Sequence, residues 1–339
     1  MANTLAVRYR PKTFEEAVGQ TSVIKILEQQ IEKRDFSNAF LFCGASGVGK
    51  TTLARIFANK INEGYGEPIE IDAASNNGVE NIRDIVKAAN ERSIDSEYKI
   101  YIIDECHTLT AQSWQAFLKC LEEPPKYTIF IFCTTDPQKI PDTIINRVMR
   151  FNFNRIKTSE IRDRLKYICE QEHFTNYDAS IDYIARISDG GMRTAISLLD
   201  KVAYYSTDIT LENTAKALGS YSFKAFLTIL KAMLDKDEKT VLKLITDYYN
   251  AGNDLKLFVN QFLTFTLDVN KYVIFQSIDM TKIPQSMEDE LRKISTLENI
   301  ASRLMNYVDS LLKLKNLLKN DSDPKSTVEI TLIGITRKF

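Results

Sequence analysis

Short apolar runs dominate the first half of the chain. The runs at residues 39–43, 99–103 and 127–133 are rich in β-branched and aromatic residues, and each is followed by a glycine or a polar residue. Such runs predict strands that are buried on both faces, as in a parallel sheet. We place a fourth strand at residues 68–75, with helices between the strands. The pattern therefore predicts a parallel α/β sheet whose ligand lies at the C-terminal ends of the strands.

The pattern changes after residue 153, where only helical periodicity remains. Segments such as "ASIDYIARISDGGMRTAISLLDKVAYY" repeat apolar residues every three or four positions, and amphipathic segments continue from residue 220. No catalytic or ligand-binding motif occurs after residue 220. We therefore expect the aromatic residues of this segment in the core or in subunit contacts. We expect three domains: an α/β domain at 1–155, a small helical domain at 156–219 and an all-helical domain at 220–339.

Charge and cysteine content indicate which partners and which cellular compartment suit the chain. The chain has 44 Lys and Arg against 45 Asp and Glu, and a net charge of -1 gives no global attraction to nucleic acid. A polyanionic partner therefore needs a local basic patch. The five cysteines form no C-x-x-C pair, which favours buried free thiols in a reducing compartment. Without a signal sequence or a run of ~20 apolar residues, we expect a cytoplasmic protein without membrane contact.

The segment "AFLFCGASGVGKTTLARIFA" contains the pattern G-x-x-x-x-G-K-T between a predicted strand and a predicted helix. In this context the glycines let backbone N–H groups surround a phosphate, Lys50 neutralises β- and γ-phosphate oxygens, and Thr51 offers a hydroxyl to Mg²⁺. An ordinary glycine-rich turn rarely supplies Lys-Thr at this spacing. The expected nucleotide-binding residues of this loop are Gly44, Ala45, Ser46, Gly47, Val48, Gly49, Lys50, Thr51 and Thr52.

Asp104 and Glu105 follow the strand predicted at residues 99–103. Beside a phosphate loop, Asp104 is expected to hold Mg²⁺ through water, and Glu105 to orient and activate the water that attacks the γ-phosphate. A role as strand terminators alone is the weaker interpretation once the phosphate loop is present. His107 has no partner at metal-ligand spacing, so packing or hydrogen bonding is favoured for it over metal binding or catalysis.

The D-E-C-H sequence at residues 104–107 also occurs in helicases. A helicase of that kind would continue with a second α/β domain that has its own strands, whereas this chain continues in helices only. One α/β core followed by small helical domains is typical of the AAA+ class of ATPases. We therefore predict an ATPase that switches shape.

Six segments in the same order closely resemble the gamma/tau subunit family of the bacterial DNA polymerase III clamp loader. They are "RYRPKTFEEAVGQ", "GASGVGKTTLARIFA", "IEIDAASNNGVENIRDI", "KIYIIDECHTLT", "FLKCLEEPPKYTIFIFCTTDPQKIP" and "DGGMRTAISLLD". The resemblance covers residues 1 to 220 strongly and the remainder weakly. It implies an AAA+ core, a helical lid domain and a helical collar that holds subunits in a ring.

The resemblance also assigns residues. A first sensor, which is a polar residue that detects the γ-phosphate, falls on "TTDP", where we favour Thr134 over Thr135. A second sensor falls on Arg193 of "GGMR", which would otherwise be an ordinary exposed helix arginine. The residues expected around the adenine base are Ala6, Arg10, Pro11 and Val18.

Two segments depart from the family pattern. The family closes its arginine-finger motif with Ser-Arg-Cys, whereas this chain has Asn146, Arg147 and Val148. We keep Arg147 as the expected finger, an arginine that reaches the nucleotide of the neighbouring subunit. The family's four-cysteine zinc module has no cysteine counterpart at residues 59–68, so zinc is not expected. We also expect no counterpart of the long tail of tau-type proteins, and a compact form, such as one encoded by a phage, would fit both expectations.

Two predicted helices, at residues 76–92 and 112–123, are the candidates for DNA contact. By the resemblance, both line the DNA channel of the assembly. Acidic residues stand beside the basic ones on the first helix, which favours an ordinary solvated face as the alternative. The candidate contacts are Arg83, Lys87, Gln112 and Lys119.

Together these features predict an ATP- and Mg²⁺-dependent motor subunit of a clamp loader. It is expected to join other clamp-loader subunits in a pentameric ring or spiral, to open a sliding clamp and to load it at primer–template DNA. Two alternatives remain. One is an AAA+ motor that remodels DNA by branch migration, which the collar-like third domain disfavours. The other is a non-hydrolysing scaffold subunit, which the intact Lys50, Thr51, Asp104 and Glu105 disfavour.

Overall fold

A computed structural model describes residues 4–218 and 223–339. The chain forms two compact units. The first comprises the chain up to Leu165 together with Ser188–Ser197, and the second comprises Lys166–Ile187 together with Leu198–Phe339. The three domain boundaries expected from the sequence stay a prediction.

A five-stranded sheet forms the centre of the first unit, with the strand order β2-β3-β4-β1-β5. All neighbouring strands are parallel, so the predicted parallel α/β sheet is confirmed. The strands are β1 (Ala39–Cys43), β2 (Ile69–Asp72), β3 (Lys99–Asp104), β4 (Thr128–Thr134) and β5 (Met149–Asn152).

Two strands differ from the sequence expectation. β2 is shorter than residues 68–75 because the chain turns after Asp72, whose carboxylate accepts hydrogen bonds from the Ala74 N–H and the Ser75 hydroxyl, both at 3.0 Å. β5 was not predicted at all. Only Phe151 of its four residues is buried, so the strand carries no apolar run.

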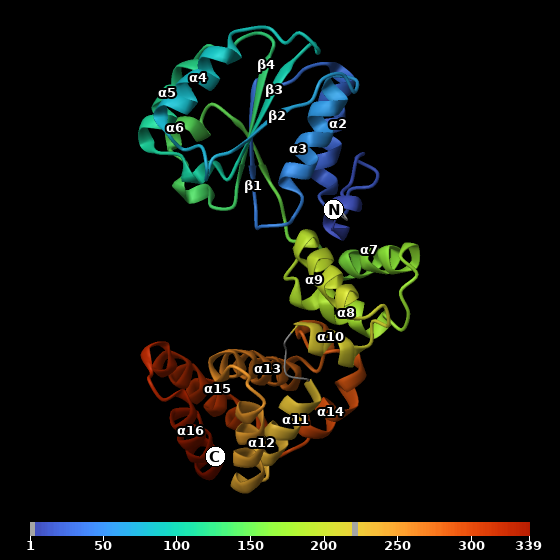
Figure 1. Cartoon of the computed structure of the whole chain (residues 1–339), viewed down its shortest axis with the longest axis vertical. Coiled ribbons are helices and arrows are strands. Elements are labelled where there is room, and N and C mark those ends of the chain that lie inside the picture. The colour runs from blue at the N-terminus through green and yellow to red at the C-terminus, as the bar shows by residue number, and fades with distance from the viewer. Residues whose placement is uncertain (1–3, 219–222) are drawn as a thin grey trace. The chain divides into compact units, whose positions relative to one another are not determined.

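Helices cover both faces of the sheet (Figure 1). Phe40 and Phe42 of β1 point to the face covered by α2 and α3, and Leu41 points to the face covered by α4, α5 and α6. Because successive side chains of a strand point to opposite faces, the inner strands are buried on both sides, as their apolar runs predicted. The helices of this unit are α1 (Leu5–Arg8), α2 (Thr21–Lys33), α3 (Lys50–Ile61), α4 (Val79–Ala89), α5 (Ala111–Glu122) and α6 (Asp142–Ile145).

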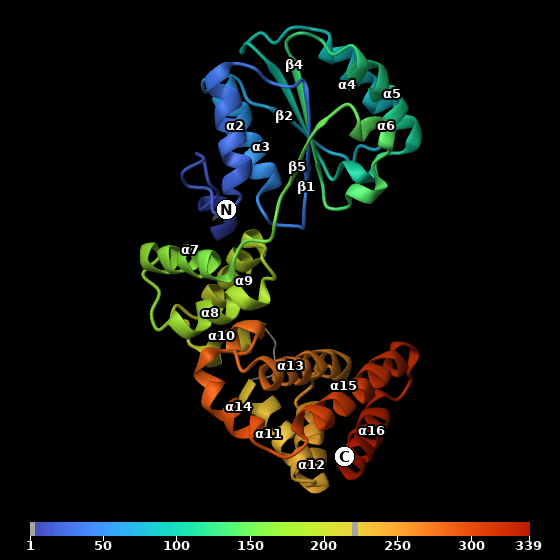
Figure 2. The ribbon, with the colours of Figure 1, turned by 180° about the vertical axis from the view of Figure 1, so that it is seen from behind.

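The second unit is helical (Figure 2). Of the aromatic residues after residue 220, Phe226, Tyr248 and Phe258 lie in its core, Phe223 packs against that core and Tyr249 is exposed. None of the helices in residues 4–218 and 223–339 combines the length and the apolar character that a bilayer crossing needs. The remaining helices, of which α7 and α9 belong partly to the first unit, are α7 (Thr158–Gln171), α8 (Asp178–Ile187), α9 (Met192–Tyr205), α10 (Leu211–Leu218), α11 (Phe223–Leu234), α12 (Glu238–Asn250), α13 (Leu255–Phe275), α14 (Glu288–Ser295), α15 (Ile300–Leu317) and α16 (Pro324–Lys338).

All five cysteines are free and buried. Burial disfavours the charged thiolate and therefore raises the pKa of every one of these thiols, to about 12 for Cys169. The prediction of buried free thiols is confirmed.

Candidate nucleotide-binding site

The phosphate loop leaves β1, an inner strand that pairs with β4 on one side and with the edge strand β5 on the other. Helix α3 begins directly after the loop, at Lys50, so its N-terminal N–H groups face the same space as the loop. Two glycines are required by geometry. Gly49 has φ of 105°, and a Cβ atom on Gly44 would lie 2.5 Å from the Phe153 carbonyl oxygen. The loop is therefore shaped for a bound phosphate, as its sequence predicted.

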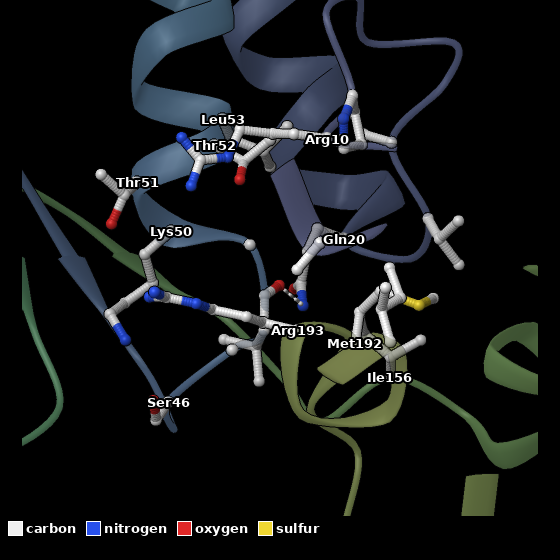
Figure 3. A pocket seen from close by; sticks show the side chains of 18 of the residues that line it. Arg10, Gln20, Ser46, Lys50, Thr51, Thr52, Leu53, Ile156, Met192 and Arg193 are labelled. Atoms are coloured by element: carbon white, nitrogen blue, oxygen red, sulfur yellow. Dashed lines mark hydrogen bonds between the residues drawn. The ribbon is translucent and has the colours of Figure 1, made fainter. Parts of the chain in front are cut away.

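A pocket opens above this loop (Figure 3). Its lining comes from the N-terminal segment, the phosphate loop with the start of α3, the end of β3, the segment from Ile156 into α7, and the start of α9. The lining includes every residue expected around the base, the loop from Ser46 to Thr52, both acids and the second-sensor arginine. In full, these predicted residues are Ala6, Arg10, Pro11, Val18, Ser46, Gly47, Val48, Gly49, Lys50, Thr51, Thr52, Asp104, Glu105 and Arg193.

Other predicted residues do not line the pocket. Gly44 and Ala45 lie at the base of the loop, where their carbonyl oxygens bind Lys50, and Thr134 is fully buried. Pocket residues that sequence reasoning did not assign include Gln20, Arg164 and Met192. Arg164 donates a hydrogen bond to the Tyr9 carbonyl oxygen at 3.0 Å and so connects α7 to the N-terminal segment. Gln20 and Met192 lie within two of the segments quoted for the resemblance but had no role assigned, and Arg164 lies outside them.

The Lys50 side chain is buried, with 6% of its surface exposed. Its ammonium group donates hydrogen bonds to the carbonyl oxygens of Gly44 and Ala45, each at 2.9 Å. An ammonium group has three N–H donors, and the two carbonyls fix the direction of the third. The charge is thus held in place before any phosphate arrives.

Thr51 and Asp104 lie side by side, although they are 53 positions apart in the chain. The Thr51 hydroxyl donates to Asp104 Oδ2 at 2.9 Å, and Asp104 Oδ1 accepts from the Glu105 N–H, also at 2.9 Å. Because the Thr51 proton points to Asp104, the lone pairs of its oxygen stay available to a cation. A hydroxyl and a carboxylate are the oxygen donors that Mg²⁺ prefers, usually with phosphates completing the set. The residues present therefore fit the Mg²⁺ expected beside a nucleotide.

Glu105 adopts a left-handed backbone conformation with φ of 46°. Its Oε2 accepts a hydrogen bond from the Thr135 hydroxyl at 2.9 Å and lies 3.2 Å from His107 Nδ1. The Thr134 hydroxyl instead faces His107 at 3.3 Å and accepts from the Asp136 N–H at 3.0 Å. Thr135 is thus the hydroxyl beside the candidate base, and the assignment of the first sensor to Thr134 stays a prediction. His107 has a hydrogen-bonding position, as expected from the sequence.

Arg193 lies at the start of α9 and faces the phosphate loop (Figure 3). Its backbone N–H donates to the Gly47 carbonyl oxygen at 3.3 Å. This contact places a cationic side chain at the pocket from a helix that follows the sheet by some forty residues, and the role of Arg193 as a second sensor stays a prediction.

Arg147 lies outside its own subunit's pocket, directly after α6. Its guanidinium donates to the Thr143 carbonyl oxygen at 2.6 Å and to Glu122 Oε1 at 2.7 Å. The side chain is 34% exposed, so it is accessible from the surface. Arg147 thus forms a surface ion pair within its own subunit, and its role as a trans-acting finger stays a prediction.

The four candidate DNA contacts are exposed. Arg83 and Lys87 lie on α4, and Gln112 and Lys119 lie on α5, which packs against α4. Thr110 caps the N-terminus of α5, and its hydroxyl accepts a hydrogen bond from the Ser113 N–H at 3.1 Å. Among the described residues, no ion pair ties Arg83 or Lys87 to a carboxylate. Both cations are therefore accessible to a polyanion.

No cluster of three or more His, Cys, Asp or Glu side chains that could hold a metal ion occurs in the described parts of the chain. Whether zinc binds stays a prediction.

Three segments of the chain match known protein families. Residues 67–157 match the family described as DNA polymerase III, delta subunit, and residues 160–207 match the DNA polymerase III clamp loader subunit, ATPase lid domain. Residues 209–338 match domain III of the DNA polymerase III subunits gamma and tau.

Solved structures are similar to the chain in fold. The RuvB Holliday junction branch migration motor of Thermotoga maritima has a TM-score of 0.52 and 22% identity, and the match covers 71% of this chain and 80% of RuvB. At this identity the likeness shows the fold alone, and together with the match to the clamp loader ATPase lid domain it supports an AAA+ core followed by helical domains. The fold predicted from the sequence is confirmed.

Similar sequences come from the bacterial replication machinery. The tau subunit of DNA polymerase III from Bacillus subtilis is 34% identical, over 96% of this chain and 62% of the relative's length. The Escherichia coli tau subunit is 29% identical, and the chain spans only 54% of its length. The gamma subunit from Buchnera aphidicola subsp. Baizongia pistaciae is 30% identical, over 97% of this chain and 95% of that subunit. The chain belongs to the family of DNA polymerase III gamma/tau subunits.

Proposed function

We propose that this chain is the ATP-hydrolysing motor subunit of a clamp loader. The observation that carries the proposal is the convergence of Lys50, Thr51, Asp104 and Glu105 on one pocket at the C-terminal ends of the strands. Family membership supports the same conclusion. In the proposed role, the subunit joins others in a pentameric ring or spiral, opens a sliding clamp and places it at primer–template DNA.

In the proposed reaction, each of these pocket residues has a separate role in ATP hydrolysis. The third N–H of Lys50 would bind the β- and γ-phosphates, and Thr51 and Asp104 would hold Mg²⁺. That ion would supply positive charge against the negative charge that develops on the phosphates during phosphoryl transfer. Glu105 would accept a proton from the attacking water, and the Thr135 hydroxyl would keep its carboxylate in position. Arg193 would detect the γ-phosphate from the lid.

Turnover in the assembly separates this proposal from its alternatives. We expect steady-state ATP hydrolysis to rise when both a sliding clamp and primed DNA are added to the assembled complex, and to rise much less with either alone. Stimulation by four-way junction DNA without a clamp would favour a branch-migration motor. The absence of turnover under every condition would favour a scaffold subunit. A primed DNA without clamp and a clamp without DNA are the matched controls.

The surface formed by α4 and α5 gives a second test. Reversing the charge of Arg83 and Lys87 together, as R83E/K87E, should weaken DNA binding and reduce the slope of log affinity against log salt. The slope should fall by roughly one unit per lost phosphate contact, because each contact releases condensed counterions. ATP affinity without DNA should be unchanged, since neither residue lines the pocket.

A matched control is available on the opposite face of the sheet. Lys25 and Lys33 are exposed on α2, and K25E/K33E makes the same change in net charge. Equal loss of DNA affinity in both double variants, or an unaltered salt slope in R83E/K87E, would identify the α4 surface as an ordinary solvated face.

A further inference from the structure

Gln20 makes three hydrogen bonds that join segments distant in the chain. Its Nε2 donates to the Asn154 carbonyl oxygen at 2.6 Å and to the Val48 carbonyl oxygen at 3.3 Å, and its Oε1 accepts from the Asn154 N–H at 3.0 Å. Val48 belongs to the phosphate loop, and Figure 3 shows the hydrogen bond to it. Asn154 lies between the end of β5 and the start of α7. One amide thus holds the loop and this connecting segment together.

The backbone at Gln20 adopts a conformation that glutamine does not favour. Its φ of 57° and ψ of 26° are left-handed, a region preferred by glycine and tolerated by asparagine. Gln20 is the residue before α2, yet its side chain makes no cap hydrogen bond to that helix. Its side chain instead contacts Val48 and Asn154. A strained residue that is held by specific partners beside a pocket points to a role at that pocket.

The segment that Gln20 holds also contacts the turn before Arg193. The Ile156 N–H donates to the Gly190 carbonyl oxygen at 3.1 Å, and Arg155 pairs with Asp189. On the other side, the Phe153 N–H donates to the Cys43 carbonyl oxygen at 2.7 Å. Residues 153–156 therefore lie between the base of the phosphate loop and the turn that leads into α9.

We infer that Gln20 is a positioning residue that sets the place of Arg193 relative to the phosphate loop. It acts through the Asn154 backbone and the turn at residues 189–191, and it does not touch the reacting atoms. This inference rests on the proposed function, because it assumes that Arg193 detects a γ-phosphate in this pocket. A positioning role predicts a specific loss: the protein should distinguish ATP from ADP less well when the amide is removed.

The Gln20→Glu variant tests the inference at constant size. The exchange places a carboxylate oxygen where an NH₂ group now faces two carbonyl oxygens, and it leaves the bond from the Asn154 N–H intact. Affinity for a fluorescent ATP analogue should fall roughly tenfold, because two carbonyl oxygens lose their shared donor and face a carboxylate instead, while affinity for the ADP analogue changes less than about twofold. Gln29→Glu on the same helix is the control, because Gln29 is exposed and the charge change is identical.

A double-mutant cycle with Arg193→Ala tests whether Gln20 affects ATP affinity through Arg193. If Gln20 acts through Arg193, Gln20→Glu should have little further effect on ATP affinity once Arg193 is alanine. Additive losses would overturn the inference and leave the proposed function intact. An Arg193→Ala variant with normal ATP affinity and normal turnover would instead count against the second sensor of the proposed function.

A second variant covers the case in which Gln20→Glu does not fold. Glycine suits the left-handed backbone at this position, so Gln20→Gly should keep a melting temperature close to that of the native protein. It should still lose discrimination between ATP and ADP. Preserved discrimination in a folded Gln20→Gly protein would overturn the inference.

Discussion

The Glu105→Gln protein should bind ATP with near-normal affinity and hydrolyse it about 10²–10⁴-fold more slowly, the range typical for loss of a general base. The amide keeps the size of the side chain but cannot accept a proton from water. The groups that would hold Mg²⁺ are unchanged, because Thr51 bonds to Asp104 and not to Glu105. This variant should therefore lose ATP hydrolysis while it keeps ATP binding. Fluorescent-nucleotide titration and single-turnover hydrolysis measure the two quantities.

Two observations would contradict this assignment. Hydrolysis at the normal rate would show that the base lies elsewhere, and a loss of ATP affinity equal to the loss of turnover would indicate that Glu105 mainly supports binding. Glu32→Gln, at an exposed position of α2, controls for the change in charge.

The Arg147→Ala protein should bind ATP normally as an isolated subunit and lose hydrolysis in the assembly. Arg147 lies outside its own pocket, so any catalytic contact must be made with a neighbour's nucleotide. An arginine that stabilises the charge on the transferred phosphoryl group is worth ~10³–10⁵ in turnover. If Arg147 only pairs with Glu122 at the surface, its loss costs about 0–1 kcal/mol of stability and nothing catalytic.

Mixing subunits distinguishes the two roles. Arg147→Ala subunits combined with Lys50→Ala subunits should regain partial turnover wherever an intact Arg147 faces an intact Lys50 site. Glu122→Gln is the matched control, because it removes the ion pair and keeps the arginine. Near-normal hydrolysis by Arg147→Ala assemblies would exclude a finger, and equal defects in Glu122→Gln and Arg147→Ala would mean that the ion pair itself is what matters.

Local patterns were sufficient for the sheet and for the phosphate loop. Buried strands carry their apolar residues in one run, and the loop carries its glycines, Lys50 and Thr51 within eight positions of Gly44. β5 lacks such a run because it lies at the edge of the sheet with one buried residue in four.

The choice between Thr134 and Thr135 depends on which face of the sheet each side chain occupies. Along β4, Phe130 and Phe132 point toward α5, so Thr134 continues that face, and its successor Thr135 turns to the face of α3 and Glu105. The resemblance placed both residues at the C-terminal end of β4, but it did not indicate which face of the sheet each side chain occupies. Gln20 and Arg164 escaped detection for a different reason. Their partners lie 134 and 155 positions away, and no spacing within a motif reports such contacts.

The burial of all five thiols has a practical consequence for chemical labelling. Maleimides react with the thiolate, and burial in this protein both hides each sulfur atom and raises its pKa. A single cysteine introduced at an exposed position, such as Ser159 at the start of α7, would therefore take up a fluorophore ahead of the native ones. No cysteine-free background is needed for such work. Preparing one would remove sulfur atoms from the packed interior around β1 and β4, where even small cavities are costly.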